Sequence, residues 1–515
     1  RFYQSSYDED LEGSWLSVNY DPWGTGITYT GFCLMGLGCL LLLCARDGGF
    51  RRLLRHPQIR KGGLFLIALF GGCQLKADPA LPVVKRVQAD SLAIQQVVYN
   101  DRVAPFNTLA RDFVQKIYGR PSFHRITPEQ VVSSWMLYPE EWNRTPIIRI
   151  KNQELRTALG LKEEYASLNH LFDGTQYKLQ PLWQREQGNR SKLAQAIQET
   201  DEKVGLILML RQGTLIRPLP PDVTPLSTQK VNAELWYNRI PFSKILFMVN
   251  LTLGFAAFGL FMFRMLTGRK EKAVSRRVWG TALCLTTLFH ATGYALRGYI
   301  RGGFPLSNGY ETMQFVALAV LLTACLLQRR FPFTRPFGFL LSGFTLLVAY
   351  LGEMNPQITP LMPVLASPWL SWHVSLIMIS YGLFAFTFLN GILALCLIGK
   401  QKNTASPITG EQIEQLTLLS RLLLYPGTFL LGIGIVLGAV WANVSWGSYW
   451  SWDPKEVWAL AAFIIYGISF HRNSLPCFQR QWLFHGYMIF AFAVVLMTYF
   501  GVNHLLGGMH SYANS

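Results

Sequence analysis

The sequence predicts a mainly α-helical fold: a polytopic membrane bundle of about ten transmembrane helices with a mixed α/β extracytoplasmic domain. Half of the 515 residues are hydrophobic, 14% are aromatic and only 15% are charged. This composition is too apolar for an ordinary soluble protein of this size. Apolar runs near the length of a membrane span recur along the chain, and one long hydrophilic section interrupts them.

The apolar runs divide the chain into residues 1–77, the hydrophilic section 78–240 and residues 241–515. A full crossing needs about 20 residues, and several runs are shorter than this. The predicted spans are 27–45, 62–77, 242–263, 278–296, 311–327, 337–352, 373–398, 422–441, 456–470 and 482–500.

The formal net charge of +17 could indicate nucleic-acid binding or basic cytoplasmic loops. If the first span runs inward, the cytoplasmic connections carry Arg46, Arg51, Arg52, Arg55, Arg60, Lys61, Arg264, Arg269, Lys270, Lys272, Arg276, Arg277, Arg329, Arg330, Arg335, Lys400, Lys402, Arg421, Arg472 and Arg480. The short outer connections carry only Arg297, Arg301 and Lys455. This asymmetry sets the orientation by the positive-inside rule, places 78–240 outside the cytoplasm and excludes a nucleic-acid partner.

The 78–240 section mixes predicted helices, at about 106–118, 128–137 and 189–200, with predicted strands at Ile147–Ile150 and Val204–Leu210. The sequence T-P-E-Q at 127–130 is a helix start signal. We identify no active site in this section. The eight cysteines predict neither a disulfide framework nor a zinc site. Because the sequence opens at Arg1 without a Met or a signal peptide, we expect an upstream portion to be missing.

Residues 446–460 read WGSYWSWDPKEVWAL and concentrate tryptophan. Tryptophans at a membrane boundary can form an interfacial belt. Trp446, Trp450 and Trp452, which share a loop with a glycine, also suit an aromatic platform for a flat ligand. The D-P-K-E sequence predicts a helix start with Asp453 as N-cap, so capping alone could explain that carboxylate.

Histidines lie on the same predicted outer surface, with His373 at the start of the seventh span and His504 and His510 after the tenth. Two imidazoles beside an aromatic wall suit haem better than zinc, which usually takes four ligands. A lone histidine is more often a hydrogen-bonded polar residue. His471, near the cytoplasmic end of the ninth span, and His290, within the fourth, could be functional because ionisable groups are costly at membrane depth.

These segments resemble the system II cytochrome c synthetases of the CcsBA (ResB–ResC) family, whose signature is the tryptophan-rich WWD segment. The resemblance covers Trp446–Glu456, Ser371-Trp-His-Val-Ser375, Phe470-His-Arg472, Gly508-Met-His-Ser-Tyr512 and Asn308-Gly-Tyr-Glu-Thr312. Residues 241–515 thus resemble the haem-handling CcsA/ResC half, with its WWD segment at 446–458. Tyr3-Gln-Ser-Ser-Tyr7 and Asp21-Pro-Trp23, within 1–77, resemble the end of the CcsB/ResB half, whose upstream portion would be a further partner.

The resemblance implies that His373 and His510 are axial ligands of haem b, held on a surface that includes Trp446, Trp450, Trp452 and Asp453. It also implies that His471 is one ligand of a second haem site within the membrane. The partner ligand of that second site lies upstream of Arg1 in the family. His290 is not among the family's ligands and is expected to be structural.

The implied function is that of a holocytochrome-c synthase type of haem lyase, which moves haem to the outer face of a bacterial inner membrane and promotes thioether attachment to apocytochrome c. The chain has no C-x-x-C-H motif of its own, so it would act on another protein. Membrane lipids and thiol-reducing proteins are further expected partners. Two alternatives stay open: a haem transporter that passes haem to a chaperone without ligation, and a structural assembly subunit.

Overall fold

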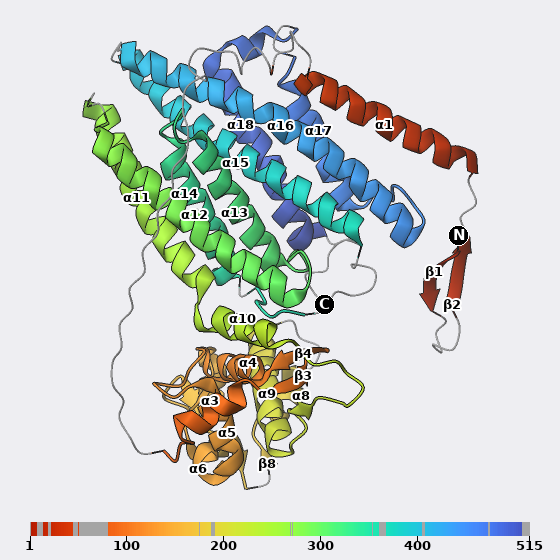
Figure 1. The fold of residues 1–515 in the computed structure, drawn as a ribbon, viewed down its shortest axis with the longest axis vertical. Coiled ribbons are helices and arrows are strands. Elements are labelled where there is room, and N and C mark those ends of the chain that lie inside the picture. Colours follow the sequence, from red (N-terminus) through yellow and green to blue (C-terminus); the bar gives the residue numbers. More distant parts are fainter. Residues whose placement is uncertain are drawn as a thin grey trace.

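The computed structural model describes residues 2–7, 14–18, 22–44, 50, 81–174, 176–186, 191–267, 269, 271–352, 354–359, 367–403, 407–471 and 474–506. These residues form a long helical bundle with a smaller unit, residues 81–240, at one end (Figure 1). The predicted span at 62–77 lies outside the described residues.

The 81–240 unit packs helices and short strands around helix α4 (Phe106–Tyr118). Leu109, Phe113 and Ile117 recur every four residues on α4 and are buried in the core. The other helices are α3 (Arg86–Ala93), α5 (Pro128–Leu137), α6 (Pro139–Arg144), α7 (Gln153–Ala158), α8 (Gln180–Glu186), α9 (Lys192–Arg211) and α10 (Thr228–Arg239). Strands β3 (Gln96–Tyr99), β4 (Arg102–Pro105) and β9 (Arg217–Pro218) pair antiparallel in the order β4-β3-β9, and β5 (Ile148–Arg149) pairs with β6 (Tyr165–Ala166) and β7 (Phe172–Asp173) with β8 (Gln176–Tyr177).

The helices predicted at 106–118 and 128–137 are confirmed as α4 and α5. Thr127 caps α5 by accepting from the backbone N–H of Gln130, whose side chain accepts from the N–H of Thr127. This capping box is what the T-P-E-Q sequence predicts. The strand predicted at Ile147–Ile150 is present only as the two residues of β5.

The strand predicted at Val204–Leu210 is wrong, because these residues continue helix α9. Val204, Ile207 and Leu210 are buried at three-residue spacing, on the face that also buries Ile197. A short apolar run cannot distinguish a buried strand from a buried helix turn, and here the helix that starts at the N-cap Ser191 extends through it.

The bundle helices run alternately up and down, and α15 and α16 pack along each other (Figure 1). The close approach is possible because residue 427 of α16 is a glycine. A Cβ at this position would lie only 2.7 Å from the Phe384 ring of α15. The bundle consists of α11 (Phe242–Thr267), α12 (Ala273–Arg301), α13 (Gly309–Leu327), α14 (Thr334–Leu351), α15 (Pro368–Asn403), α16 (Pro407–Trp446), α17 (Pro454–Ile468), α18 (Gln481–Leu496) and the π-helix η5 (Met497–Leu506).

Among the described residues, six helices are long and apolar enough to cross a membrane: α11, α13, α14, α15, α16 and α18. The prediction of a polytopic helical membrane protein is therefore confirmed, but a count of ten spans is not. Helix α12 covers the fourth predicted span but carries four arginines, and α17 covers the ninth with only 15 residues.

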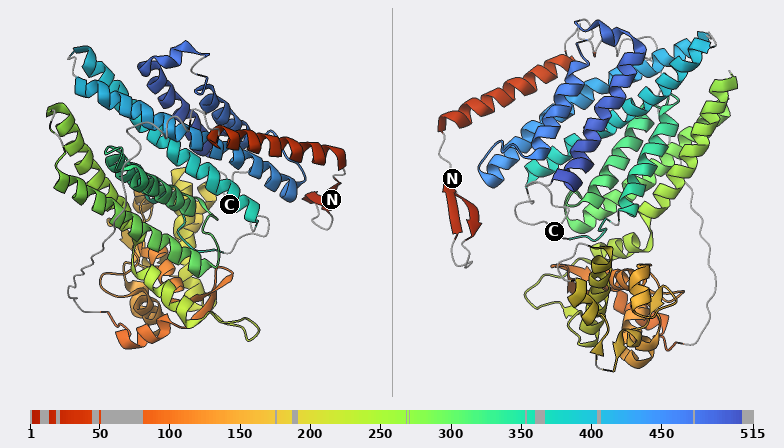
Figure 2. Two further views of the ribbon diagram at one scale, coloured as in Figure 1. Left: turned by 45° about the horizontal axis from the view of Figure 1, so that its top comes forward. Right: turned by 180° about the vertical axis from the view of Figure 1, so that it is seen from behind.

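Near its N-terminus the chain forms an antiparallel hairpin of β1 (Phe2–Tyr7) and β2 (Ser14–Val18), followed by helix α1 (Pro22–Cys44). Helix α1 covers the first predicted span and runs beside the α16–α17 side of the bundle (Figures 1 and 2). Tyr29 and Phe32 of α1 make edge contacts with the ring of Tyr449, at centroid distances of 5.8 and 6.1 Å.

Candidate functional site

The tryptophan-rich segment is a loop between the end of α16 and the start of α17. Gly447 ends α16 with φ +78° and donates its N–H to the carbonyl of Asn443. Trp452 has φ +59°, a left-handed conformation that is rare for a bulky residue, and its side chain is 74% exposed. Its ring meets that of Trp450 edge to face, with centroids 6.0 Å apart. The loop thus exposes an aromatic ring, that of Trp452, from a strained backbone conformation. This combination is typical of ligand sites.

Asp453 caps helix α17, as the D-P-K-E sequence predicts. Its carboxylate accepts from the backbone N–H of Lys455 at 3.0 Å, and Glu456 accepts from the N–H of Asp453 at 3.2 Å. Glu456 also accepts from the backbone N–H of Ser451 at 2.9 Å. Two acidic side chains therefore tie the loop that carries Trp450 and Trp452 to the first turn of α17.

Substitution of Asp453 should separate capping from charge. Asparagine caps about as well as aspartate, so Asp453→Asn should keep cytochrome or haem yield within about twofold. Asp453→Ala should cost about 1 kcal/mol of local stability, which corresponds to about a fivefold shift in the ordered loop population. Haem content and protease protection of the loop would measure this. If the Asn variant is as damaged as the Ala variant, the negative charge itself is required.

His373 lies in the first turns of α15 and is half-buried against α16. Its Nδ1 lies 2.7 Å from the carbonyl oxygen of Gly434. A carbonyl can only accept, so Nδ1 must carry the proton and Nε2 carries the lone pair that can bind a metal. A backbone carbonyl on the other ring nitrogen is the usual support of a metal-ligating histidine.

The space for the His373 ring comes from Gly438 of α16, a feature that the sequence analysis does not predict. A Cβ on Gly438 would lie 2.5 Å from Cε1 and 2.6 Å from Nδ1 of His373. Gly434 and Gly438 form a G-x-x-x-G pattern, a known signal for close helix approach in membranes. Gly438 lies eight residues before Trp446, so His373 lies about 12 Å from the loop measured along the helix axis.

The end of the described chain returns to the same end of the bundle. Helix α18 continues into the π-helix η5, which packs on α17 toward the side that faces the 81–240 unit (Figure 2). Thr498 donates to the carbonyl of Trp458 at 3.3 Å. Single turns of π-helix are frequent at functional sites, and η5 is longer than one turn. His510, together with the side chains of His504 and Trp446, lies outside the described part.

His471 lies at the other end of α17, where its side chain is exposed. Helix α17 has 15 residues and spans about 22 Å, so the structure separates His471 from the tryptophan loop. The ring of its neighbour Phe470 contacts that of Tyr425, with centroids 4.8 Å apart. His290 is buried and bonds Gln314 through Nε2 at 3.0 Å, which suits a structural histidine.

A strap at residues 354–359, on the chain between α14 and α15, joins the bundle to the 81–240 unit. Arg297 of α12 donates to the carbonyl oxygens of Pro356 at 2.7 Å and Gln357 at 2.9 Å. The same guanidinium pairs with Glu311 at 2.7 Å, and both side chains are buried. Loss of one partner of such a pair typically costs about 3–5 kcal/mol, so this clamp is a firm attachment point.

The 81–240 unit grips the strap from its own side. Arg102 of β4 donates to the carbonyl of Ile358 at 2.9 Å and pairs with the buried Glu234 of α10 at 2.5 Å. The side chain of Gln357 contacts Asn100 at 3.3 Å and Tyr99 at 3.3 Å. Two arginine–glutamate pairs, one from each part of the molecule, therefore hold the strap in place.

Asp112 of α4 makes this junction sensitive to pH. Burial raises the pKa of Asp112 to about 6, although Arg111 and Arg102 oppose the shift. The unfolded value is about 3.9, so the protonated form adds stability below about pH 4 that is lost as pH rises through 6. Melting temperatures of the solubilised full chain should show Asp112→Asn gaining on wild type between pH 4 and 7. A difference independent of pH would contradict the shift.

The structure thus gathers His373, Trp450, Trp452 and Asp453 near one end of the bundle, and places His471 at the other. Sequence patterns did not reveal the strap or its arginine–glutamate pairs. The sequence indicates Asn308-Gly-Tyr-Glu-Thr312 only through its resemblance to the synthetases, whereas the structure shows that Asn308 is the N-cap of α13 and that Glu311 pairs with Arg297. One imidazole with an oriented Nε2 and an exposed indole wall fit a large, flat, metal-bearing ligand such as haem.

The chain is similar in sequence to known proteins, over its C-terminal half and over its whole length. A family model described as cytochrome C assembly protein matches residues 306–510. Protein NrfI of Wolinella succinogenes is 32% identical, in an alignment that covers 100% of this chain and 65% of that protein. CcsA cytochrome c biogenesis proteins of Synechococcus sp. and Prochlorococcus marinus are 33% and 32% identical over 51% of this chain, and 94% and 93% of their own lengths are covered. The chain therefore spans about two thirds of NrfI and nearly all of the CcsA proteins.

Proposed function

The chain belongs to the cytochrome c assembly family of integral membrane proteins, and we propose that it is a cytochrome c synthetase that holds haem for attachment to apocytochrome c. The observation that carries this proposal is His373, whose Nδ1 is anchored on the Gly434 carbonyl at the end of the bundle that bears the Trp450–Trp452 loop. The names of the CcsA relatives, cytochrome c biogenesis proteins, support the same assignment.

In this proposal haem b is the substrate, and the protein acts by positioning. Nε2 of His373 binds the iron on one side, and His510 binds it on the other. The indoles of Trp446, Trp450 and Trp452 cover the ring, while Asp453 and Glu456 fix the loop that carries them. Holding the reacting groups in one geometry can supply about 7–11 kcal/mol of a barrier.

The attachment step needs no nucleophile from this chain. Each cysteine thiol of the apocytochrome C-x-x-C-H motif adds across one vinyl group, which forms one C–S and one C–H bond and consumes the S–H bond and the π bond of the vinyl C=C. The step is balanced without an oxidant, and it needs thiols that are kept reduced. The histidine of the motif can replace one protein imidazole on the iron, so that the product leaves.

His471 is proposed to serve a second haem site within the membrane, separate from the first by the length of α17. Its partner ligand would come from the CcsB/ResB-like portion, of which residues 1–77 are the proposed end. In the proposed arrangement, residues 78–240 form an extracytoplasmic domain and 241–515 the haem-handling domain. Both domains contact the strap at residues 354–359, which precedes α15. These contacts support a role for 78–240 in fixing the position of the outer end of α15.

The proposed orientation puts the tryptophan loop and 78–240 on the periplasmic side of a bacterial inner membrane, as the distribution of basic residues predicts. Cysteines introduced at exposed Ser448 or in the 81–240 unit should react with a membrane-impermeant maleimide in intact cells. A cysteine at Lys400 should react only after lysis. The reverse pattern would exclude a common outer surface for the site.

The function is tested by expression of the complete protein, or this chain with its upstream partner, in cells that lack their own cytochrome c maturation system. A synthetase should yield covalent cytochrome c from a co-expressed apocytochrome, detected by haem stain after denaturing electrophoresis. A haem transporter that does not ligate would bind haem, with a b-type pyridine haemochrome, but would yield no covalent product. That outcome would assign the chain the function of a haem transporter instead of a synthetase.

A further inference from the structure

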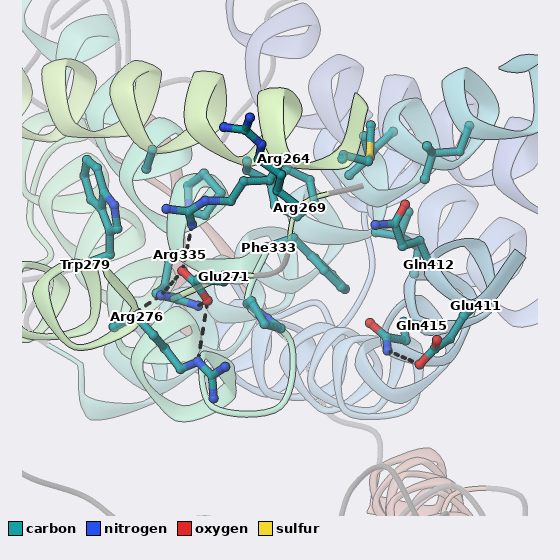
Figure 3. Close-up of a pocket in the computed structure, with 18 residues that line it drawn as sticks. Arg264, Arg269, Glu271, Arg276, Trp279, Phe333, Arg335, Glu411, Gln412 and Gln415 are labelled. Atoms are coloured by element: carbon teal, nitrogen blue, oxygen red, sulfur yellow. Dashed lines mark hydrogen bonds and ion pairs between the residues drawn. The ribbon is translucent and has the colours of Figure 1, made fainter. Parts of the chain in front are cut away.

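A second candidate ligand site lies at the end of the bundle opposite the 81–240 unit. A cavity of about 340 Å³ opens there between the end of α11, the starts of α12 and α14, the end of α15 and the start of α16 (Figure 3). It is distant in the fold from the tryptophan loop, and neither His373 nor His471 lines it. The cavity therefore needs an explanation of its own.

The charges that line this cavity do not balance. Arginines 264, 269, 276 and 335 line one side of it together with Glu271, and Glu411 lies on the other side, which leaves an excess of positive charge. Glu271 alone pairs with Arg264 at 3.2 Å, Arg276 at 3.6 Å and Arg335 at 2.8 Å. One carboxylate cannot neutralise three guanidinium groups, so the cluster attracts a further anion.

The buried member of the cluster fixes its shape. The side chain of Arg335 is 3% exposed and binds both carboxylate oxygens of Glu271, at 3.1 and 2.8 Å. Its Nε is buried and has no hydrogen-bond partner among the described residues. Arg269 is exposed, and its guanidinium lies 5.7 Å from the centre of the Phe263 ring. Arg335 and Glu271 thus form a rigid floor. Arg264 donates to Glu271 at 3.2 Å and to Oγ of Ser275 at 2.7 Å, and the exposed Arg269 and Arg276 present further donors.

Apart from Gln412 and Gln415 of α16, the rest of the lining is mostly apolar, and it borders the lipid-facing edge of the bundle. Phe261 and Met265 of α11 line it together with Leu393 and Leu397 of α15. Helix α11 stands at the outer edge of the bundle in Figure 1, and only 22% of its most apolar window is buried. The ligand must therefore join a negative head to an apolar chain, at the depth where the spans end.

We propose that this cavity binds one anionic phospholipid, with its phosphate held by Arg264, Arg269 and Arg276 and an acyl chain along Phe261 and Leu397. Guanidinium groups recognise phosphate through paired, charge-assisted hydrogen bonds. Basic pockets between helices at a membrane surface are a known type of lipid headgroup site. The lipid would add a contact between α11 and α14–α16, beside the Glu271 ion pairs that join α11, α12 and α14 at this end.

The full chain can be tested in nanodiscs of phosphatidylcholine mixed with phosphatidylglycerol. Native mass spectrometry after detergent release should find phosphatidylglycerol retained in preference to phosphatidylcholine. The double variant Arg269→Gln/Arg276→Gln leaves the Arg335–Glu271 floor intact and should reduce this retention at least about tenfold, since it removes two of the three guanidinium groups proposed to bind the phosphate. Lys400→Gln/Arg480→Gln, cations at the same end but outside the cavity, should retain the lipid as wild type does.

Equal retention of the two lipids by wild type, or equal loss in both double variants, would overturn the proposal. Release of the retained lipid by millimolar inorganic phosphate would also overturn it, because the cavity would then be a soluble-anion site. Competition by haemin for the same arginines would assign the cavity to haem instead. A melting temperature of the Arg269→Gln/Arg276→Gln variant close to wild type in phosphatidylcholine alone confirms that the variant is folded.

Discussion

Replacement of His373 by alanine is expected to lower the yield of covalent cytochrome by at least about tenfold, since even loss of a residue that supports a metal ligand costs about 10- to 100-fold. The variant leaves a gap beside Gly434 and Gly438, where the ring now lies. Added imidazole should enter the gap and restore part of the yield. The correction should be incomplete and should need millimolar imidazole, because a free ligand lacks the effective concentration of a tethered one. Soret absorbance and haem-stained product measure the two effects.

Three further variants make this result specific. His510→Ala should show the same loss and the same partial correction, because it is proposed to bind the opposite face of the iron. His504→Ala should resemble wild type, since the resemblance to the synthetases assigns it no role. His471→Ala should respond weakly to imidazole and should reduce haem supply. Normal yield from both His373→Ala and His510→Ala would end the proposed mechanism.

The features that could be predicted from the sequence are those specified by neighbouring residues. The cap at Asp453 needs only D-P-K-E, and the capping box at Thr127 needs only T-P-E-Q. The bundle helices follow from apolar runs of sufficient length. The same local rules fail at Val204–Leu210, where the apolar spacing suits a strand as well as a helix. These residues are helical because the helix that starts at the N-cap Ser191 continues through them.

The features that could not be predicted depend on which segments meet in space. Nothing near Arg297 in sequence indicates that it binds carbonyls at 356 and 357, or that Arg102 binds the next one. The cavity proposed to bind a lipid likewise combines side chains from five helices. The sequence indicates that the side chain of His373 is an imidazole, which can bind haem iron, and that it lies on the predicted outer surface. It does not indicate that α16 supplies both the acceptor and the space for its ring.

Gly438→Ala is expected to reduce haem binding at the tryptophan loop by about tenfold or more, but by no more than His373→Ala does, because disturbing the support of a metal ligand costs about 10- to 100-fold in affinity. The added Cβ would lie 2.5 Å from Cε1 of His373, whereas carbon atoms prefer about 3.5–4.0 Å. The ring must therefore shift and stretch its bond to Gly434. Alanine is a better helix former than glycine by about 1 kcal/mol, so α16 itself should not weaken. Soret absorbance of the purified variant measures the loss.

Gly467→Ala in α17 is the matched control, since a Cβ there meets nothing within 4 Å, and it should leave haem content unchanged. The decisive comparison is the double variant His373→Ala/Gly438→Ala. If Gly438 acts only by making room for the imidazole, its substitution should cost nothing further once that ring is gone, so the two losses should be strongly non-additive. Full additivity would mean that Gly438 serves the site through some other contact. The space that Gly438 provides on α16 would then not be what orients Nε2 of His373.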